Sequence, residues 1–413
     1  MKVNVKSYGC SANIAEGEII KGQFEEADEK NADWIIYNIC TVKGDAKILR
    51  EIRKFRKQNP DKKLAITGCI APSIIEPLKK IDSDILLINT HHIDKIKELI
   101  QEKQNALTYA KTIKLGYQRK RNNPVIGIVP IANGCLDACA FCSTHLVKGP
   151  LYSYPPDKIL EEVKKCVQDG CKEIWITAQD TCCYGFDTGT NLAELLQKIV
   201  EIQGEFFVRV GMGNPRHSIK YLDELVSVMK HPKIFKFLHI PLQSGNNEVL
   251  KAMRRGHTVE TFKQIVNAFR KEIPEITIST DIIAGYPTET EAQFEDTLKA
   301  MQEIKPDIIN ISRFAPRPGT PAAEMPQVHG NIRKQRSRKL TELRWKIELE
   351  KNRQWLNWEG EIIIDEKVKD GMGGRNYAYK LIIIRKDLPL GTKINVEITE
   401  AHATYLLAQE GKC

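Results

Sequence analysis

The feature that most restricts the fold of this chain is a regular alternation of strand-like and helix-like segments. In the first third, apolar strand candidates cover residues 2–9, 33–39 and 62–68, and each is followed by a helical pattern. Parallel strands need a long crossover connection between them, usually a helix, so this alternation predicts βαβ units. We therefore expect an N-terminal α/β domain built on a parallel sheet.

The alternation resumes in longer form between about residues 125 and 325. Six strand candidates lie there, at residues 125–131, 173–178, 206–211, 235–241, 276–285 and 308–314. Six βα units over such a length predict an open, partial (β/α)6 barrel. In barrels of this kind the chemistry is located at the carboxyl ends of the strands.

The last part of the chain has a different pattern. A basic helical run over residues 331–360 precedes short strand candidates, which lie at residues 361–370, 377–385, 393–401 and 403–409. Glycines separate them, at Gly371, Gly373, Gly374 and Gly391. This pattern predicts a small antiparallel β-barrel at the C-terminus. The predicted domains are thus residues 1–117, 118–350 and 351–413.

Composition narrows the class of protein. The chain has 413 residues, of which 42% are hydrophobic and 28% charged, which is typical of two or three globular domains rather than a disordered protein. The net charge of +9 favours a polyanionic partner.

No apolar run reaches the roughly 20 residues of a membrane span, and the charged start "MKVNVKSYGC" does not resemble a signal peptide. We therefore expect a soluble cytoplasmic protein with no membrane partner. Its eleven cysteines are then better interpreted as ligands, reactive thiols or small core residues than as disulfides.

Three of these cysteines, Cys135, Cys139 and Cys142, follow the strand candidate at 125–131 directly. Thiolates are soft ligands that suit iron–sulfur clusters or zinc. Spacing alone favours a cluster, but His145 is close enough for a Cys3His zinc site, and incidental cysteines are a third reading. Three ligands on a four-iron cluster would leave one iron open to a substrate.

A second trio is dispersed along the N-terminal third. Cys10 follows the first strand candidate, Cys40 ends the second, and Cys69 follows the third. The carboxyl ends of parallel strands lie on one edge of a sheet, so these thiols are expected to converge there and form a second three-cysteine site. The alternative is that each is a buried small residue. The sequence suggests ordinary core or surface roles for the remaining cysteines, which are Cys166, Cys171, Cys182, Cys183 and Cys413. The assignment is least certain for Cys182 and Cys183, because they too follow a barrel strand.

The central motif, with Phe141 before its last cysteine, resembles the signature of the radical S-adenosylmethionine (SAM) enzymes. Nearly the whole chain is similar to the methylthiotransferases of that group, which have a three-cysteine N-terminal domain, a radical SAM barrel and a C-terminal TRAM domain. The matching segments are "YGCSAN", "NICTVK", "ITGCIA", "GCLDACAFC", "AQDTCCYG", "LHIPLQSGNNEVLKAMRRGHT", "TDIIAGYPTETEAQFEDT" and "RFAPRPGTPAAEM". One departure is Ile39, where the family usually has Thr, and it leaves the ligand Cys40 unchanged.

The resemblance implies two [4Fe–4S] clusters. Cys135, Cys139 and Cys142 would hold the cluster that binds SAM, and Cys10, Cys40 and Cys69 the auxiliary cluster that carries the sulfur to be inserted. Reductive cleavage of SAM would give a 5′-deoxyadenosyl radical that removes a hydrogen from an unactivated carbon, and a second SAM would supply the methyl group. Gln179 and Arg209, at or near predicted strand ends, are candidate SAM contacts, although hydrogen bonding within the barrel explains them equally well.

The resemblance also implies a substrate. Family members modify adenosine 37 beside the tRNA anticodon, or an aspartate of a ribosomal protein, and the basic excess favours RNA. The motifs are most similar to the archaeal and eukaryotic-type branch, which converts N6-threonylcarbamoyladenosine to its 2-methylthio derivative; the branch that acts on N6-isopentenyladenosine is the alternative.

The basic run from Arg333 to Arg353 could hold RNA or could be a solvated helix, and Tyr377 and Tyr379 could stack on bases or pack in a core. A ferredoxin or flavodoxin is the expected electron donor. A non-catalytic, metal-containing RNA-binding protein is the competing class.

Overall fold

The computed structural model describes residues 1–41 and 44–411, so Cys413 lies outside the described residues. The chain begins with a five-stranded parallel sheet of order β2-β1-β3-β4-β5. Its strands are β1 (Lys2–Ser7), β2 (Glu25–Glu26), β3 (Trp34–Ile39), β4 (Lys63–Gly68) and β5 (Leu86–Asn89). Its helices are α1 (Ser11–Gly22), α2 (Asp45–Gln58), α3 (Pro72–Ile81), η2 (Thr90–Lys95) and α4 (Ile96–Gln101). The three predicted strands are present; the short β2 and β5 were missed.

Strand β3 shows why this sheet is covered on both faces. All six of its residues are buried, and successive side chains point to opposite faces. Ile35 and Tyr37 pack in one apolar cluster with α2 and α3, while Trp34 and Ile36 pack in another with α1, η2 and α4. A continuous apolar run is typical of a parallel strand between two helical layers.

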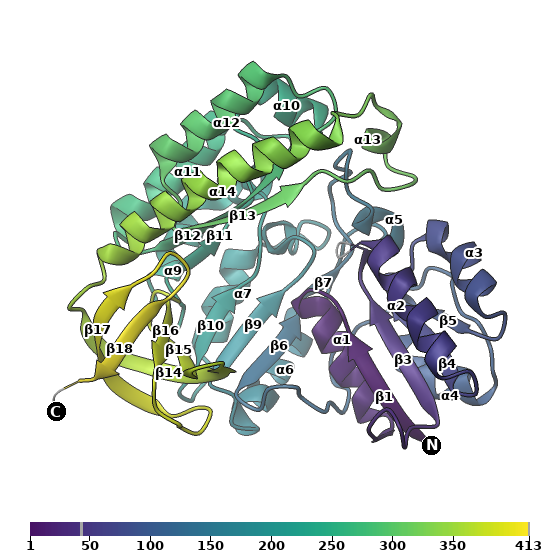
Figure 1. Ribbon diagram of the computed structural model, residues 1–413. Helices are drawn as coiled ribbons and strands as arrows, with labels where there is room; N and C mark the ends of the chain where they lie inside the picture. The colour runs from purple at the N-terminus through teal and green to yellow at the C-terminus, as the bar shows by residue number, and fades with distance from the viewer. Residues whose placement is uncertain (42–43, 412–413) are drawn as a thin grey trace.

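The central part confirms the predicted partial barrel. Its six strands form two parallel three-stranded sheets, β10-β9-β6 and β11-β12-β13, joined by a bridge between Val208 and Ile234. The strands are β6 (Ile126–Pro130), β9 (Glu173–Thr177), β10 (Phe207–Val210), β11 (Phe237–His239), β12 (Thr277–Ala284) and β13 (Ile308–Arg313). The helices pack outside this curved sheet (Figure 1), and the largest apolar core of the molecule lies between the two layers.

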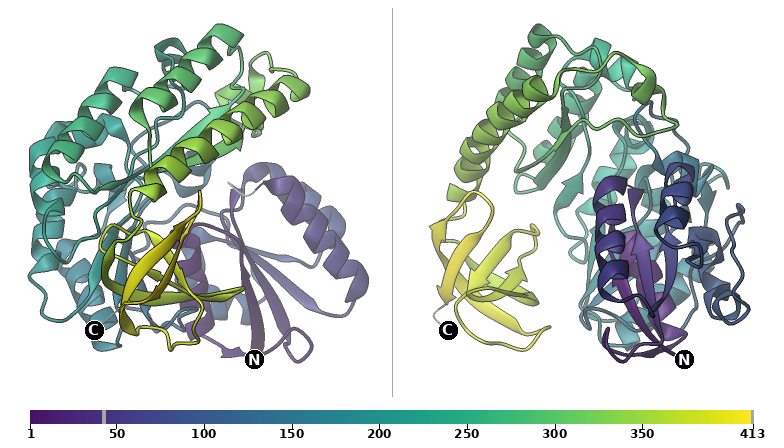
Figure 2. Two further views of the ribbon diagram at one scale, coloured as in Figure 1. Left: turned by 60° about the vertical axis from the view of Figure 1, so that its left-hand side comes forward. Right: turned by 45° about the vertical axis from the view of Figure 1, so that its right-hand side comes forward.

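The helical elements of this part are the following: α5 (Thr144–Lys148), α6 (Pro156–Gln168), η3 (Thr181–Cys183), α7 (Leu192–Val200), α8 (Pro215–Ser218), η4 (Ile219–Tyr221), α9 (Leu222–Met229), α10 (Asn247–Ala252), α11 (Val259–Glu272), α12 (Glu291–Ile304), α13 (Pro321–Glu324) and α14 (Gly330–Arg353). A short antiparallel pair, β7 (Ala132–Asn133) with β8 (Tyr152–Ser153), closes the loop after β6. Helix α14 contains most of the basic run and extends from the region after β13 to the C-terminal barrel (Figure 1; Figure 2).

The C-terminal part is a closed barrel of order β14-β15-β16-β18-β17. Its strands are β14 (Glu359–Val368), β15 (Gly371–Arg375), β16 (Leu381–Ile384), β17 (Lys393–Ala401) and β18 (Leu406–Glu410). Two details differ from the sequence prediction. The glycines of 371–374 were interpreted as turn residues but lie in β15, where the neighbouring strand is so close that a side chain at Gly374 would lie 2.7 Å from the Ile363 carbonyl oxygen. In addition, β16 and β18 are parallel, so the barrel is not wholly antiparallel.

A buried pair of carboxyl groups lies where this barrel packs against the central part. Glu173 starts β9 and Asp365 lies on β14, and their two buried carboxyl groups interact so that each raises the pKa of the site when both are charged. Trp175 donates its indole N–H to Glu173 at 2.9 Å, and Arg375 donates to Asp365 at 3.2 Å. Burial, with the neighbouring Asp365 carboxylate, raises the pKa of Glu173 to about 8.

This pair predicts a pH-dependent stability. Because the folded protein holds a proton on Glu173 that the unfolded chain loses near its ordinary pKa of 4.5, stability falls as the pH rises from about 4.5 to about 8. Glu173→Gln keeps the hydrogen-bonding shape without the titration. The expected result is a smaller decrease in melting temperature across that pH range than in the parent chain. Thermal unfolding of both proteins at a series of pH values measures it, and parallel curves would contradict the prediction.

Among the described residues, no helix combines the length and the apolar character needed to cross a bilayer.

Candidate metal centres

The structure brings the three N-terminal cysteines together. Cys10 is the N-cap of α1, Cys40 follows β3 and Cys69 follows β4, all at the carboxyl edge of the first sheet. The three thiols interact electrostatically, although they are 30 and 29 residues apart in sequence. Cys10 is exposed, whereas Cys40 and Cys69 are buried. The N-terminus of the 12-residue helix α1 places a positive dipole end at this edge, beside Cys10.

Two asparagines hold this edge in place. Asn13, in the first turn of α1, donates to the side-chain oxygen of Asn38 at 2.6 Å, and Asn38 donates to the backbone carbonyl of Asn13 at 2.6 Å. The pair thereby ties the helix after Cys10 to the strand before Cys40. Gly68 has a φ of +85°, and a side chain there would lie 2.4 Å from Asn38 Oδ1, so a glycine is needed before Cys69.

The asparagine pair gives a test of this arrangement. Asn38→Leu keeps the approximate volume but removes both hydrogen bonds between the asparagines and leaves Asn13 Nδ2 with the Ile39 carbonyl alone, which is expected to cost about 1–3 kcal/mol of stability. It is also expected to lower the iron bound at the N-terminal trio. Denaturant unfolding and iron analysis after reconstitution measure both effects. Asn31→Ala removes an exposed hydrogen bond to Asp28 and serves as the control, so an equal effect of the two substitutions would contradict the prediction.

A buried ionic cluster lies beside the trio. Glu16 Oε1 accepts hydrogen bonds from Lys114 Nζ at 2.5 Å, Lys148 Nζ at 2.6 Å and Thr90 Oγ1 at 2.7 Å. These residues come from α1, the segment before β6, α5 and η2, so the cluster joins the N-terminal sheet to the central part. With two ammonium groups and one carboxylate, its net charge is positive, and Lys148 acts electrostatically on Cys69 and Cys10.

The opposite charges in this cluster keep one another ionised. Burial alone would raise the pKa of Glu16, but Lys114 and Lys148 lower it to about 2. Burial lowers the pKa of Lys114 to about 8, against the pull of Glu16. Burial also opposes the charge of Lys148, yet Glu16 and the nearby thiols raise the pKa of Lys148 above its ordinary value. A fixed positive charge beside thiolates stabilises any anionic group bound there.

The central trio lies on one loop between β7 and β8, and all three side chains are half-buried. Cys142 N donates to the Cys139 carbonyl at 3.1 Å, which folds the last cysteines into a turn. Gly134, with a φ of +78°, passes so close to Pro150 that a side chain would lie 2.0 Å from its carbonyl oxygen. Gly134 N donates to Gln179 Oε1 at 2.8 Å, so Gln179 does lie at this loop.

Asp137 anchors the loop to the barrel. Its carboxylate accepts hydrogen bonds from Asn214 Nδ2 at 2.7 Å, Arg216 Nη1 at 2.8 Å and His217 Nε2 at 2.9 Å. Burial opposes ionisation, but these partners keep the pKa of Asp137 below its usual value. Asp137 also forms a compact group with Cys135 and Asp180. Because its carboxylate already has three donors, we interpret it as a loop anchor rather than a metal ligand.

Sequence reasoning missed Arg255. This residue, in the segment "AMRRGHT", is buried, and its guanidinium donates to Cys139 Sγ at 3.2 Å and to the Pro241 carbonyl at 3.2 Å. It supplies positive charge directly at a thiol of the central trio. Cys183 also interacts with Cys135, so one of the two cysteines after β9 does lie at the central trio. The paired arginines of the segment were visible in sequence, but no periodicity shows that one of them reaches the loop.

Arg209, the second candidate SAM contact, lies between the partial barrel and the C-terminal barrel. Its guanidinium carbon is 5.0 Å from the ring centre of Trp175, 5.1 Å from that of Phe237 and 5.3 Å from that of Tyr379. These contacts form a cation–π cage between the partial barrel and the C-terminal barrel. Tyr379 is buried in that cage and is not exposed for base stacking, and both it and Tyr377 lie in the turn between β15 and β16.

The thiols of neither trio are as close together as a zinc site requires. Tetrahedral zinc with Zn–S bonds of about 2.3 Å requires sulfurs about 3.8 Å apart. Within the described ranges, the one compact group of potential ligands, with ligand atoms within 4.8 Å of one another, is Cys135, Asp137 and Asp180. Neither cysteine trio forms such a group, and His145 does not join one. A four-iron cluster is larger and takes its thiolates further apart.

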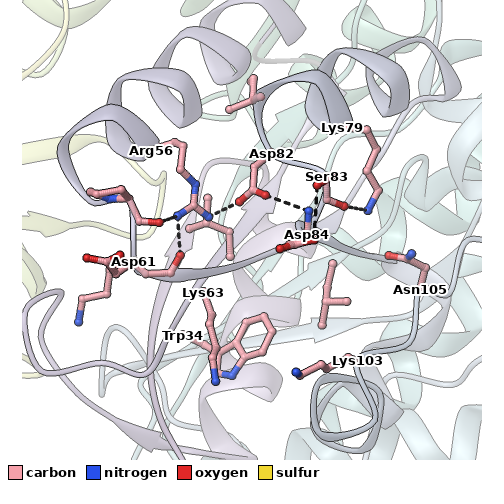
Figure 3. Close-up of a pocket in the computed structure, with 15 residues that line it drawn as sticks. Trp34, Arg56, Asp61, Lys63, Lys79, Asp82, Ser83, Asp84, Lys103 and Asn105 are labelled. Carbon is pink, nitrogen blue, oxygen red and sulfur yellow. Dashed lines mark hydrogen bonds and ion pairs between the residues drawn. The ribbon is translucent and has the colours of Figure 1, made fainter.

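A large cavity lies at the opposite edge of the first sheet. It has a volume of about 740 Å³ and is lined by charged residues at the amino ends of the strands (Figure 3). Two of its cations are already bound within the fold: Arg56 pairs with Asp82, and Lys79 donates to the carbonyls of Ser83 and Ile85. Size alone therefore does not identify the functional site. The loop after β13 instead closes on the cysteine edge, where Arg317 donates to the Thr41 carbonyl.

The model of the Radical SAM superfamily matches residues 129–301, and that of the "Uncharacterized protein family UPF0004" matches residues 2–90. The "Probable threonylcarbamoyladenosine tRNA methylthiotransferase" of Pyrococcus horikoshii is 40% identical over 99% of both chains. The protein of the same name from Methanothermobacter thermautotrophicus is 37% identical over 99% of both chains. The Drosophila melanogaster protein is 34% identical over 97% of this chain and 76% of its own length.

The chain belongs to the threonylcarbamoyladenosine tRNA methylthiotransferase family. As a family member it is a radical SAM enzyme, and SAM and two [4Fe–4S] clusters are its cofactors. The two matched regions each contain one cysteine trio.

Solved structures agree on the fold of this family member. A radical SAM methyltransferase, TsrM from Kitasatospora setae, superposes with a TM-score of 0.50 at 13% identity, covering 78% of this chain and 75% of its own. The cobalamin-dependent radical enzyme OxsB gives a TM-score of 0.53 at 13% identity, covering 78% of this chain and 54% of its own. At these identities the likeness concerns the fold alone.

Proposed function

We propose that this protein inserts a methylthio group at C2 of N6-threonylcarbamoyladenosine 37 in tRNA, giving the 2-methylthio derivative. The observation that carries the proposal is the end-to-end similarity to methylthiotransferases of this name, at 40% identity over 99% of the chain. The convergence of Cys10, Cys40 and Cys69 at one sheet edge supports it further, since the transfer of sulfur requires a second cluster beside the SAM cluster.

In this proposal each trio holds one cluster, with Cys135, Cys139 and Cys142 at the SAM cluster. When bound, the clusters supply one-electron chemistry and the transferred sulfur. Arg255 places a positive charge at Cys139. Gln179 fixes the backbone of Gly134 at the start of the cysteine loop and is the better candidate for a SAM contact. Arg209 as a SAM contact stays a prediction; its ring cage supports a role in joining the two barrels.

The partners follow from the same reasoning. The anticodon stem-loop of tRNA is the proposed substrate, and a small ferredoxin or flavodoxin in the cytoplasm the proposed electron donor. The division into residues 1–117, 118–350 and 351–413 is retained, with the last part as a TRAM domain.

Helix α14 supports an RNA contact only in part. Arg336 is buried and paired with Glu289 and Glu291, so it acts in the fold. Lys334 and Arg338 are exposed, and Trp345 is 55% exposed on the same helix. Cations beside an exposed aromatic ring suit single-stranded RNA.

This face gives a binding prediction. Arg338→Glu is expected to weaken tRNA binding several-fold and to reduce its salt dependence, because one phosphate contact is lost. Filter binding at two salt concentrations measures it. Lys386→Glu, on the C-terminal barrel, makes the same charge change and serves as the control. Equal losses in the two variants would show general electrostatics rather than a contact on α14.

Mass spectrometry of tRNA nucleosides from a deletion strain tests the function. The expected result is loss of 2-methylthio-N6-threonylcarbamoyladenosine with accumulation of its unmodified precursor, restored by the parent gene. Loss of the 2-methylthio-isopentenyladenosine derivative, or of a modified ribosomal aspartate, would instead assign another branch of the family. Anaerobic reconstitution that yields zinc and no SAM cleavage would favour the non-catalytic class.

A further inference from the structure

A pair of cysteines outside both trios lies at the end of α6. The helix ends in a Schellman motif: Cys171 N donates to the Cys166 carbonyl at 3.0 Å, and Gly170 N donates to the Val167 carbonyl at 3.0 Å. Gly170 has the required positive φ of +89°. In this motif the first and last residues usually make an apolar contact, and here that contact is made by two thiols.

These thiols have polar surroundings despite their burial. Cys166 and Cys171 are each only 1% exposed, and their side chains hydrogen-bond to each other. Arg121 Nη2 lies 3.5 Å from Cys166 Sγ, and the same guanidinium pairs with Asp169 at 2.8 Å. Cys171 Sγ lies 3.6 Å from the Pro124 carbonyl oxygen. An ordinary apolar contact would have neither a guanidinium nor a carbonyl against its sulfur atoms.

The neighbours distinguish the two thiols. The hydrogen bond from Cys171 and the charge of Arg121 lower the pKa of Cys166, although burial opposes them. The same hydrogen bond, with burial, raises the pKa of Cys171. Thus Cys166, with Arg121 3.5 Å from its sulfur, is favoured as the attacking thiolate, and Cys171, whose thiol faces the Pro124 carbonyl, as the resolving cysteine.

We propose that Cys166 and Cys171 form a reversible dithiol–disulfide site, oxidised by exchange with low-molecular-weight disulfides. A disulfide needs Cα atoms about 4.4–6.8 Å apart, and the backbone hydrogen bond between these same residues holds them close. The site is separate from both cysteine trios and does not depend on which nucleoside is the substrate.

The exchange balances as follows. The Cys166 thiolate attacks one sulfur of the small disulfide, forming a mixed disulfide and releasing one small thiolate. Cys171 then loses its proton to solvent and attacks the Cys166 sulfur; the mixed bond breaks and the second small thiolate leaves. Two electrons pass from the protein dithiol to the small disulfide. Access requires only local opening of the exposed Asp169–Gly170 turn, because helix ends open more readily than cores.

The site has a structural consequence. Arg121 and Pro124 belong to the segment that leads from the N-terminal sheet into β6, and both contact the cysteine pair. Oxidation removes the thiolate that faces Arg121, so the contact between this segment and α6 is expected to weaken.

Trypsin releases both cysteines of the site in one short peptide, so its redox state can be measured by mass spectrometry. Trypsin cleavage after Lys165 and Lys172 releases residues 166–172, which contain both cysteines. The reconstituted holoprotein is equilibrated anaerobically at different ratios of reduced to oxidised glutathione, alkylated and digested. The expected product at oxidising ratios is this peptide without alkylation and lighter by two hydrogens, reverting to the doubly alkylated form on reduction. The peptide of residues 173–198 carries the buried Cys182 and Cys183 and is the internal control, expected to stay alkylated.

Variants distinguish the roles of the two thiols. Cys171→Ala is expected to accumulate glutathione on Cys166, whereas Cys166→Ala acquires none on Cys171. Arg121→Leu is expected to slow disulfide formation several-fold, and Arg121→Lys to restore it in part. A peptide 166–172 that stays doubly alkylated at every ratio, or that is oxidised only after the visible absorbance of the clusters is lost, would overturn the proposal. Equal glutathione adducts in the two alanine variants would overturn the assignment of Cys166.

Discussion

Cys40→Ala is expected to abolish methylthio transfer while SAM cleavage continues. Cys40 lies with Cys10 and Cys69 at the sheet edge, whereas the loop that holds Cys135, Cys139 and Cys142 belongs to the central part. Loss of one N-terminal ligand should therefore remove about half of the bound iron and leave the SAM site intact. Iron analysis, 5′-deoxyadenosine release and nucleoside mass spectrometry of modified tRNA measure the three quantities on one reconstituted preparation.

Two further variants sharpen this experiment. Cys139→Ala is expected to abolish both SAM cleavage and methylthio transfer, because its thiol belongs to the central trio. Cys182→Ala is the matched control, since it removes a buried thiol outside both trios and should retain iron and both activities. If Cys40→Ala and Cys139→Ala lost SAM cleavage equally, the two trios would not hold separate centres.

Lys148→Met has the second largest expected effect. Lys148 is buried, and its ammonium group shares Glu16 with Lys114 at the junction between the N-terminal sheet and the central part. Removing it leaves a buried carboxylate with one cation fewer, which is expected to cost about 3–5 kcal/mol. The positive charge beside Cys69 is also lost, so the N-terminal centre should bind less iron and have a lower reduction potential.

The two consequences are measured separately. Denaturant unfolding of the protein without iron reports the stability, and a redox titration followed by electron paramagnetic resonance reports the potential. Lys148→Arg keeps the charge and should restore the potential better than the stability, because the larger guanidinium fits the buried site poorly. Lys339→Met removes an exposed lysine that pairs with Glu291 and Glu295 and should change neither quantity. A parent-like potential in Lys148→Met would contradict the electrostatic role.

Much of the fold was visible in local sequence patterns. Continuous apolar runs such as residues 34–39 form buried parallel strands, and all six strands of the partial barrel lie where the periodicity predicted them. Two of the errors occur where side-chain chemistry is uninformative. The glycines of 371–374 form a strand because the closed barrel needs a close backbone approach, and the two-residue β2 is too short to give a pattern.

By itself, the sequence determined the two cysteine trios and their position after successive strands, because the carboxyl ends of parallel strands meet at one edge whatever the details of packing. It did not determine which charged groups lie beside the thiols. Glu16, Lys114 and Lys148 are up to 132 residues apart in sequence, and Arg255 is 116 residues from Cys139. Only the tertiary structure brings them together, because the position of a buried charge depends on where several separate elements pack, and no local periodicity records that.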